Sequence, residues 1–176
     1  MRHTHLPEHK FVSGQPETGA DLADDLERIA TNFGPENIAA CIVEPIAGST
    51  GTLVPPKGYL QKLRETCDKH GILLIFDEVI TGWGRTGSSF ASHEFGVTPD
   101  IMTMAKATTN GVVPMGVVAC KDEIYDGVMD ASPMGSVELF HGYTYSGIPV
   151  AVAAALAVQD IFEKEDIFER AKNLAP

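Results

Sequence analysis

Two kinds of hydrophobic pattern alternate along the chain. In some segments apolar side chains recur every three or four residues, which predicts amphipathic helices; in others they stand in short unbroken runs, which predicts buried strands. The predicted elements, in order, are a helix over Asp21 to Thr31, a strand over Ile38 to Val43, a helix over Pro56 to His70, strands over Ile72 to Phe76, Ile101 to Met104 and Val117 to Cys120, and a helix over Pro149 to Phe162. No internal repeat divides them, so we expect one compact α/β unit.

The segment from Ile38 to Phe76 has the order strand, helix, strand. Gly71 follows the predicted helix at the position where a residue with positive φ commonly ends one. Connections of this kind are right-handed, so the two strands should run parallel and end at the same edge of the sheet. Because ligands bind at that edge in layered α/β proteins, the residues that follow the strands are the first candidates for chemistry.

Composition narrows the class of protein. The chain has 176 residues, 44% of them hydrophobic, and 24 acidic against 13 basic residues, for a net charge of -11. This charge argues against binding nucleic acid or an anionic membrane. The longest apolar stretch, Pro149 to Val158, is shorter than the roughly 20 residues that span a bilayer. The histidine-rich start, Met1 to Lys10, lacks the apolar core of a secretory signal and has too few converging ligands for a metal site, so we expect a cytoplasmic protein without a bound metal.

The cysteines are expected to be reduced. The chain has three cysteines, Cys41, Cys67 and Cys120, which is an odd number. They are far apart in the sequence, and none belongs to a CxxC motif. This pattern fits free thiols in apolar or helical surroundings better than disulfides or a zinc site.

Two polar residues directly follow predicted strands. Asp77 follows the apolar run Ile72 to Phe76, whose side chains exclude water and so strengthen the electrostatic interactions of the carboxylate. An aspartate that only caps the turn after a strand would have the same spacing. Lys106 stands between two alanines, which leave room for a flat ligand, although most lysines are solvated surface residues. The separation of Asp77 and Lys106 is about one crossover length, so neighbouring strands could bring the carboxylate and the amine to one edge.

The same residues carry a resemblance to a known family. The stretch LLIFDEVITGWGRTG (Leu73 to Gly87), followed by PDIMTMAKATTNG (Pro99 to Gly111), resembles the signature of class III pyridoxal-phosphate-dependent aminotransferases. IVEPIAGSTG (Ile42 to Gly51) and HGYTYSG (His141 to Gly147) extend the resemblance over nearly the whole chain, which is most similar to the β-alanine or ω-amino acid:pyruvate transaminases. The resemblance implies a three-layer α/β sheet of the fold type I, aspartate aminotransferase-like large domain.

The resemblance also implies roles for individual residues. Lys106 would form the internal aldimine with pyridoxal 5'-phosphate, and Asp77 would pair with the pyridinium nitrogen, which keeps the ring an electron sink. Val79 would press against one face of the ring. Glu44, at a strand end on the same edge, would support the residues that contact the cofactor, although a residue that only caps a helix or turn is an equal alternative for it. Thr144 would reach the cofactor phosphate of a neighbouring subunit, which implies a homodimer. The implied reaction is transamination between an ω-amino acid or amine donor and pyruvate or another keto acid.

Arg85 is expected to be a structural or salt-bridging residue rather than the arginine that binds the substrate carboxylate. Two features differ from the family pattern. Ile148 stands where the most similar subgroup more often has histidine. The chain is also less than half the usual family length. We therefore expect residues 1–176 to be a partial cofactor-binding domain, without the N-terminal segment that starts a phosphate-binding helix and without the small C-terminal domain, and to be inactive by itself.

Two alternatives remain open at this stage. An apolar strand followed by Asp-Glu also occurs in P-loop ATPases, but that reading needs a G-x-x-x-x-G-K-[ST] loop, which the chain lacks. The other alternative is a non-catalytic remnant that acts only as the partner of another subunit.

Overall fold

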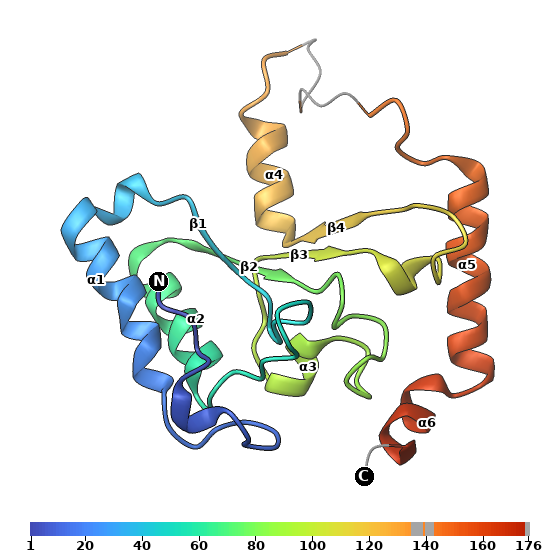
Figure 1. Ribbon diagram of the computed structural model, residues 1–176. Helices are drawn as coiled ribbons and strands as arrows, with labels where there is room; N and C mark the ends of the chain where they lie inside the picture. Colours follow the sequence, from blue (N-terminus) through green and yellow to red (C-terminus); the bar gives the residue numbers. More distant parts are fainter. Residues whose placement is uncertain (135–138, 140–142, 175–176) are drawn as a thin grey trace.

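The fold is built on one sheet of mixed direction (Figure 1). The computed structural model describes residues 1–134, 139 and 143–174. The strands β1 (Ala40–Val43), β2 (Leu73–Asp77), β3 (Ile101–Met104) and β4 (Val117–Cys120) lie side by side in chain order. The first three are parallel, and β4 is antiparallel to β3. All four predicted strands are confirmed.

The helices surround this sheet unevenly. They are α1 (Asp24–Phe33), α2 (Tyr59–His70), α3 (Ala91–Phe95), α4 (Asp122–Asp130), α5 (Pro149–Lys164) and α6 (Ile167–Leu174), with short 3-10 turns η1 (Pro7–His9), η2 (Ala20–Ala23), η3 (Pro35–Asn37) and η4 (Lys106–Thr108). α2 starts at Tyr59 rather than at Pro56, because Gly58 has a φ of 80° and interrupts a right-handed helix. The described helices α3, α4 and α6 were not predicted.

The hydrophobic core lies between the sheet and the pair α1 and α2. Leu26 of α1, Leu63 of α2, and Leu74 and Phe76 of β2 are all at most 3% exposed. The expectation that the first strand is buried on both faces is wrong in this structure, because Ile42 of β1 is 62% exposed. The structure contains the sheet and one helical layer of the expected three-layer fold.

Asp100 fastens the sheet to α2 at the start of β3. Its Oδ2 accepts hydrogen bonds from the backbone N–H of Leu74 (2.7 Å) and from the guanidinium of Arg64 (2.8 Å). Its Oδ1 lies 2.7 Å from Nζ of Lys121. Burial by itself would raise the pKa of Asp100, but the hydrogen bonds from Lys121, Leu74 and Arg64 together lower it. The ionised carboxylate therefore holds α2, β2 and β3 in place.

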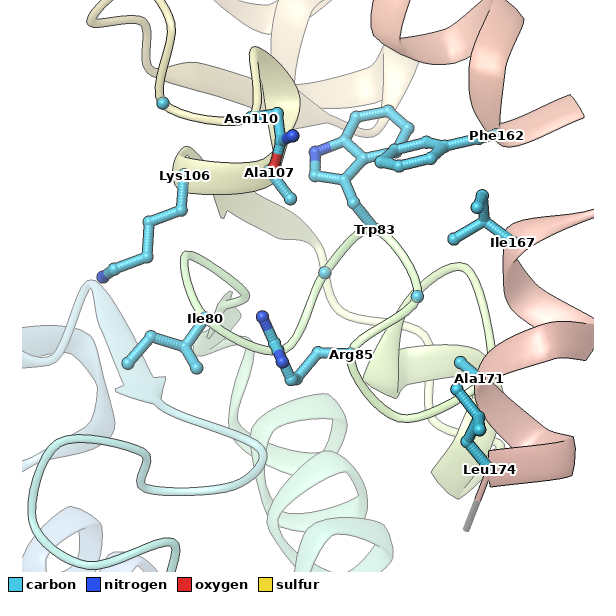
Figure 2. A pocket seen from close by; sticks show the side chains of 13 residues that line it. Ile80, Trp83, Arg85, Lys106, Ala107, Asn110, Phe162, Ile167, Ala171 and Leu174 are labelled. Atoms are coloured by element: carbon cyan, nitrogen blue, oxygen red, sulfur yellow. The ribbon is translucent and has the colours of Figure 1, made fainter. Parts of the chain in front are cut away.

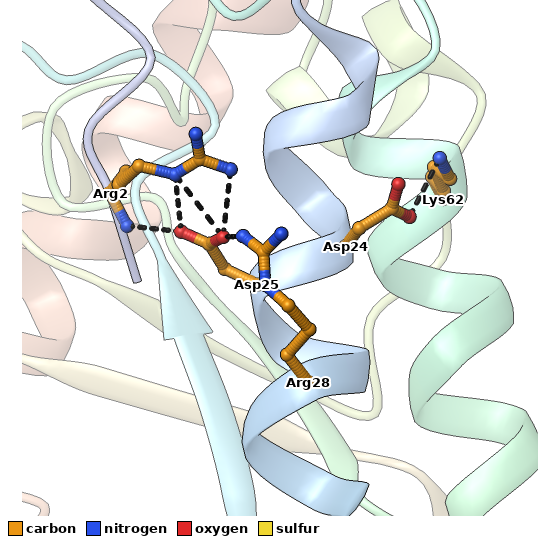
Figure 3. Close-up of polar contacts among 5 residues, drawn as sticks. All are labelled: Arg2, Asp24, Asp25, Arg28 and Lys62. Atoms are coloured by element: carbon orange, nitrogen blue, oxygen red, sulfur yellow. Dashed lines mark hydrogen bonds and ion pairs between the residues drawn. The ribbon is translucent and has the colours of Figure 1, made fainter.

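Asp25 fastens the first residues of the chain to α1 (Figure 3). The backbone N–H of Arg2 donates to its Oδ2 at 2.7 Å, the Arg2 guanidinium bonds both oxygens, and Arg28 pairs with the same carboxylate. On a neighbouring part of the helix, Asp24 pairs with Lys62 of α2 at 2.7 Å. These contacts hold α1 against the N-terminal segment and against α2.

Other features bear on the class of protein. Within the described residues, no helix is both long and apolar enough to cross a membrane, and no group of three His, Cys, Asp or Glu could hold a metal ion. All three cysteines are free: Cys41 and Cys67 are buried, and Cys120 is exposed. The pKa of the Cys67 thiol is raised, mainly by its hydrogen bond with the thiol of Cys41 and also by its burial.

Candidate active site

Asp77 and Lys106 lie at the carboxyl ends of neighbouring parallel strands. Asp77 is the last residue of β2 and is in register with Thr103 of β3. Lys106 follows β3 after one intervening residue and begins η4. Just beyond Asp77, the backbone N–H of Glu78 donates to the Thr103 carbonyl at 2.9 Å, which continues the pairing of the two strands. The structure thus places the carboxylate and the amine at one edge of the sheet, as their spacing predicted.

Lys106 lines a cavity of about 850 Å³ at this edge. Figure 2 shows its side chain leaving η4 on the side of Ile80, with Trp83 and Arg85 on the loop that follows β2. Apolar residues of α5 and α6, Phe162, Ile167, Ala171 and Leu174, form the opposite wall. A concave space with apolar walls and few polar groups is typical of small-molecule binding sites.

The amine of Lys106 differs from most other lysine amines of the chain. Within the described residues, six lysines form ion pairs with carboxylates: Lys57, Lys62, Lys69, Lys121, Lys164 and Lys172. Among the residues that the structure describes, Lys106 has no such partner, and its backbone has a φ of 39°. Positive φ in a residue other than glycine is costly and is concentrated at functional sites. Lys106 therefore combines an uncommitted amine with a constrained backbone.

The carboxylate of Asp77 is only partly engaged. Its Oδ1 accepts a hydrogen bond from the backbone N–H of Val79 at 3.0 Å, which is the turn-capping contact expected of a strand-end aspartate. Oδ2 accepts no hydrogen bond from the described part of the chain. Capping and chemistry are therefore compatible, because one oxygen serves the turn while the other is available to a ligand.

Glu78 is a structural residue that the sequence did not reveal. Its side chain is completely buried and accepts hydrogen bonds from the Thr81 hydroxyl (2.8 Å) and from the backbone N–H groups of Ala91 (2.7 Å) and Ser92 (2.8 Å). It thereby caps α3 and closes the glycine-rich loop that follows β2. A charged residue beside Asp77 was the only signal, and the sequence did not show which of the two carboxylates points inward.

The glycine-rich loop packs tightly against α6. A Cβ atom at Gly84 would lie 2.5 Å from the ring of Phe168, so a larger residue does not fit there without movement. Arg85, the next residue of this loop, is exposed and lines the cavity. It forms no ion pair with a described residue. Val79 is partly buried, and it is the next residue, Ile80, that lines the cavity.

Glu44 lies apart from this cavity. It follows β1, and its Oε2 accepts a hydrogen bond from the backbone N–H of Gly48 at 3.0 Å. It lines a different cavity of about 580 Å³, together with Arg2, His3 and Tyr59. The capping role that the sequence left open for Glu44 is therefore present, and contact with the Lys106 cavity is not seen in the described structure.

Thr144 lies in an exposed turn before α5. Residues 141 and 142, the first two of the HGYTYSG motif, fall outside the described residues. Residues 145–148 of the same turn, which include Ile148, line a cavity of about 570 Å³ with Ala105, the residue that precedes Lys106. The turn therefore approaches the end of β3, while Thr144 itself does not line the larger cavity in the described structure.

Comparison with known proteins identifies relatives of this arrangement. The model of the family "Aminotransferase class-III" matches residues 3–175. An omega-aminotransferase of Caulobacter vibrioides is 59% identical over 175 residues, which are 99% of this chain and 40% of that protein. A beta-alanine--pyruvate aminotransferase of Pseudomonas aeruginosa is 52% identical over an alignment of 178 positions, which covers 100% of this chain and 40% of that protein.

The solved structures give the same result for the fold. An amine transaminase from an uncultivated Pseudomonas species, in its PLP-bound internal aldimine form, is similar with a TM-score of 0.80 and 46% identity over 85% of this chain and 34% of that chain. The chain spans about 40% of the length of the curated relatives it matches. The match to the family model over nearly every residue and the agreement in fold lead to one conclusion: the chain belongs to the class III aminotransferase family.

Proposed function

We propose that the chain is part of the large, cofactor-binding domain of an aminotransferase that uses pyridoxal 5'-phosphate to transfer an amino group between an ω-amino acid or amine donor and pyruvate or another keto acid. The observation that carries this proposal is that the uncommitted amine of Lys106, which lines the cavity, and the half-engaged carboxylate of Asp77 lie at the carboxyl ends of adjacent parallel strands. Family membership and the names of the relatives support the same chemistry.

The residues at the sheet edge fit this cofactor. Pyridoxal phosphate needs an amine for its aldehyde carbon and an anion for its ring nitrogen, and the two side chains offer both groups. The adjoining cavity has room for a flat ring and has apolar walls. When bound, the cofactor supplies an electron sink for the electron pair that remains when a proton leaves the substrate Cα.

Each candidate residue then has a defined task. Lys106 binds the aldehyde carbon through Nζ and carries the proton between substrate and cofactor. Asp77 uses Oδ2 to hold the proton on the ring nitrogen. Val79, which precedes the cavity-lining Ile80, would contact the ring, and Glu44 would act at a distance by fixing the turn after β1. Thr144 contributes to the phosphate site of a second copy, so the active form is a homodimer.

Two further properties belong to this proposal. The relatives are two and a half times as long as the chain, and we infer that the missing parts supply the phosphate-binding helix and the substrate-binding arginine, so that the chain is inactive without them. The free cysteines support a reducing compartment, and we infer that the enzyme acts in the cytoplasm.

The test restores the missing parts with a relative. The chain replaces the matching segment of the Caulobacter vibrioides omega-aminotransferase, and alanine formation from pyruvate is measured with β-alanine as donor. The graft should be active, Lys106→Ala should abolish activity, and the matched control Lys57→Ala, which removes an exposed ion-paired lysine, should not change it. Activity that survives Lys106→Ala would contradict the proposal, and a folded but inactive graft would favour the non-catalytic remnant.

A further inference from the structure

The only tryptophan of the chain, Trp83, is firmly held in the glycine-rich loop. Its backbone N–H donates to the Ser89 carbonyl at 2.7 Å, and its φ is 61°. Its ring packs against Phe90 of the same loop, with 5.0 Å between ring centroids, and stacks on Phe162 of α5 at 6.3 Å. Phe90 and Phe162 thus hold the ring in place, and its N–H is left to bond another residue.

That edge is bonded to the turn that carries Lys106. Nε1 of Trp83 donates to the hydroxyl of Thr108 at 2.9 Å, and the same hydroxyl donates to the carbonyl of Ala105 at 2.9 Å. Thr108 is 2% exposed, so neither bond competes with bulk water. Ala105 and Thr108 stand on either side of Lys106, and the two hydrogen bonds therefore close the turn around it.

The turn needs such support because its backbone is strained. Lys106 has a positive φ, as does Asn110 in the same turn. Conformations of this kind persist only where the surroundings fix them. Besides the bond from the Thr108 hydroxyl, the turn is closed by backbone hydrogen bonds from the N–H of Thr108 to the Ala105 carbonyl (2.9 Å) and from the N–H of Gly111 to the Lys106 carbonyl (3.1 Å). The bond from Trp83 is an addition that comes from outside the turn.

The same loop is fixed at its other end by Glu78, the neighbour of Asp77. Asp77 and Lys106 are therefore joined by two routes. One is the register of β2 and β3, and the other runs from Glu78 through the loop to Trp83 and Thr108. A displacement of the tryptophan would move the amine relative to the carboxylate.

We propose that Trp83 is a positioning residue: through the hydroxyl of Thr108 it holds the turn that presents the Lys106 amine to the cofactor. This inference rests on the proposed function, because it assigns Lys106 the cofactor aldehyde. It makes the tryptophan N–H, rather than the bulk of the ring, the group that matters. Trp83→Phe removes the N–H and keeps an aromatic ring, whereas Phe90→Leu removes packing from the ring and keeps the hydrogen bonds.

The first readout needs no cofactor. Amide hydrogen exchange of the full 176-residue chain reports on the N–H groups of Thr108 and Gly111, which close the turn. In Trp83→Phe and in Thr108→Val, exchange at both amides should rise about fivefold, the effect of one lost hydrogen bond of ordinary strength. Thr108→Ser keeps a hydroxyl and should restore slow exchange, and Phe90→Leu should stay within about twofold of the unmodified chain.

The second readout uses the active graft described above. At limiting pyridoxal phosphate, borohydride fixes the cofactor to the lysine that binds it, and peptide mapping measures the label on Lys106. Trp83→Phe and Thr108→Val should each lower this label about fivefold. The double variant should lower it no further, because each single variant already removes the hydrogen bond from Trp83 to Thr108. Thr108→Ser should restore the label.

The outcomes separate this inference from the proposed function. Label on Lys106 that Trp83→Phe leaves unchanged, or a Thr108→Ser variant that behaves like Thr108→Val, would overturn the positioning role alone. Label on a different lysine in the unmodified graft would overturn the proposed function and the positioning role with it. A general loss of stability would make Phe90→Leu as harmful as Trp83→Phe, and that result would also overturn the inference.

Discussion

Asp77 and Glu78 show how two adjacent carboxylates acquire different roles. Glu78 is completely buried and accepts three hydrogen bonds, whereas Oδ2 of Asp77 accepts none from the described residues. Successive side chains of a strand point in opposite directions, so one carboxylate enters the protein and the other stays at the sheet edge. The buried one builds the loop, and the other is available to a ligand.

This difference predicts the effect of Asp77→Asn in the graft. The variant should still bind pyridoxal phosphate, but its kcat should fall at least about a hundredfold, which is about 2.8 kcal/mol at about 1.4 kcal/mol per factor of ten. A neutral amide cannot hold the proton on the ring nitrogen. Steady-state alanine formation measures the loss, and Asp21→Asn, at an exposed aspartate, is the control. Turnover within about threefold of the unmodified graft would leave Asp77 with its capping role only.

At the scale of elements, the strands and long helices were predictable because the hydrophobic pattern of each involves only residues near one another in the sequence. β3, β4 and the start of α5 agree with the sequence, and each begins or ends beside a proline or a polar residue. α3 was not predicted because it is one short helix whose start depends on Glu78, which is distant in sequence. The exposure of Ile42 was not predictable either, since an apolar run does not show which of its faces is covered.

The candidate site was predictable to the same extent. That Asp77 and Lys106 lie at one edge of the sheet was predictable, because parallel strands deliver the residues after them to the same edge. The contacts that hold them were not found, because the hydrogen bonds from Trp83 to Thr108 and from Ser92 to Glu78 join residues whose approach depends on the complete fold. The separate cavity of Glu44 shows the limit of the strand-end rule, since sharing an edge does not ensure sharing a site.

The contacts of Asp100, which hold α2 to the sheet, predict that the free energy of unfolding depends on pH. The pKa of Asp100 is lowered in the fold, so its contribution is present above the pKa of the unfolded chain, about 3.9, and is lost as the pH falls through the folded value. Asp100→Asn should therefore lower the free energy of unfolding by about 2 kcal/mol at pH 7. The difference from the unmodified chain should shrink below pH ~4.

Urea unfolding of the dilute chain, followed by the fluorescence of its single tryptophan, measures this difference at each pH. Asp21→Asn serves as the control, because that exposed carboxylate has no ion pair with a described residue. An equal loss of stability at pH 7 and at pH 3 would show that the charge of Asp100 is not what holds α2 to the sheet.

At the scale of the whole molecule, large apolar side chains remain on the surface. Ile42 of β1, Val118 of β4, and Val150 and Leu156 of α5 are 61% to 69% exposed. Contiguous exposed apolar surface promotes association. The described structure thus has a covered face, where α1 and α2 pack, and further surfaces that lack apolar partners.

The exposed apolar side chains predict how the 176-residue chain associates when it is expressed by itself. It should self-associate, and with pyridoxal phosphate, β-alanine and pyruvate it should form no appreciable alanine, because the groups that position cofactor and substrate contribute about 7 kcal/mol or more when complete. Light scattering and an alanine assay on one preparation measure both properties. A monomer with substantial turnover would show that the chain already holds a complete site.

The central claim is that Lys106 is the residue that binds the cofactor. The most direct measurement is to reduce the graft with borohydride in the presence of pyridoxal phosphate and to map the pyridoxyl group by mass spectrometry of its peptides. The account predicts stoichiometric label on Lys106 and its loss in Lys106→Ala. Of the seven other lysines of the chain, six pair with carboxylates of described residues, and Lys10 lies in the N-terminal segment with its amine over the ring of Phe11. Stoichiometric label on any other lysine, with Lys106 unmodified, would contradict it.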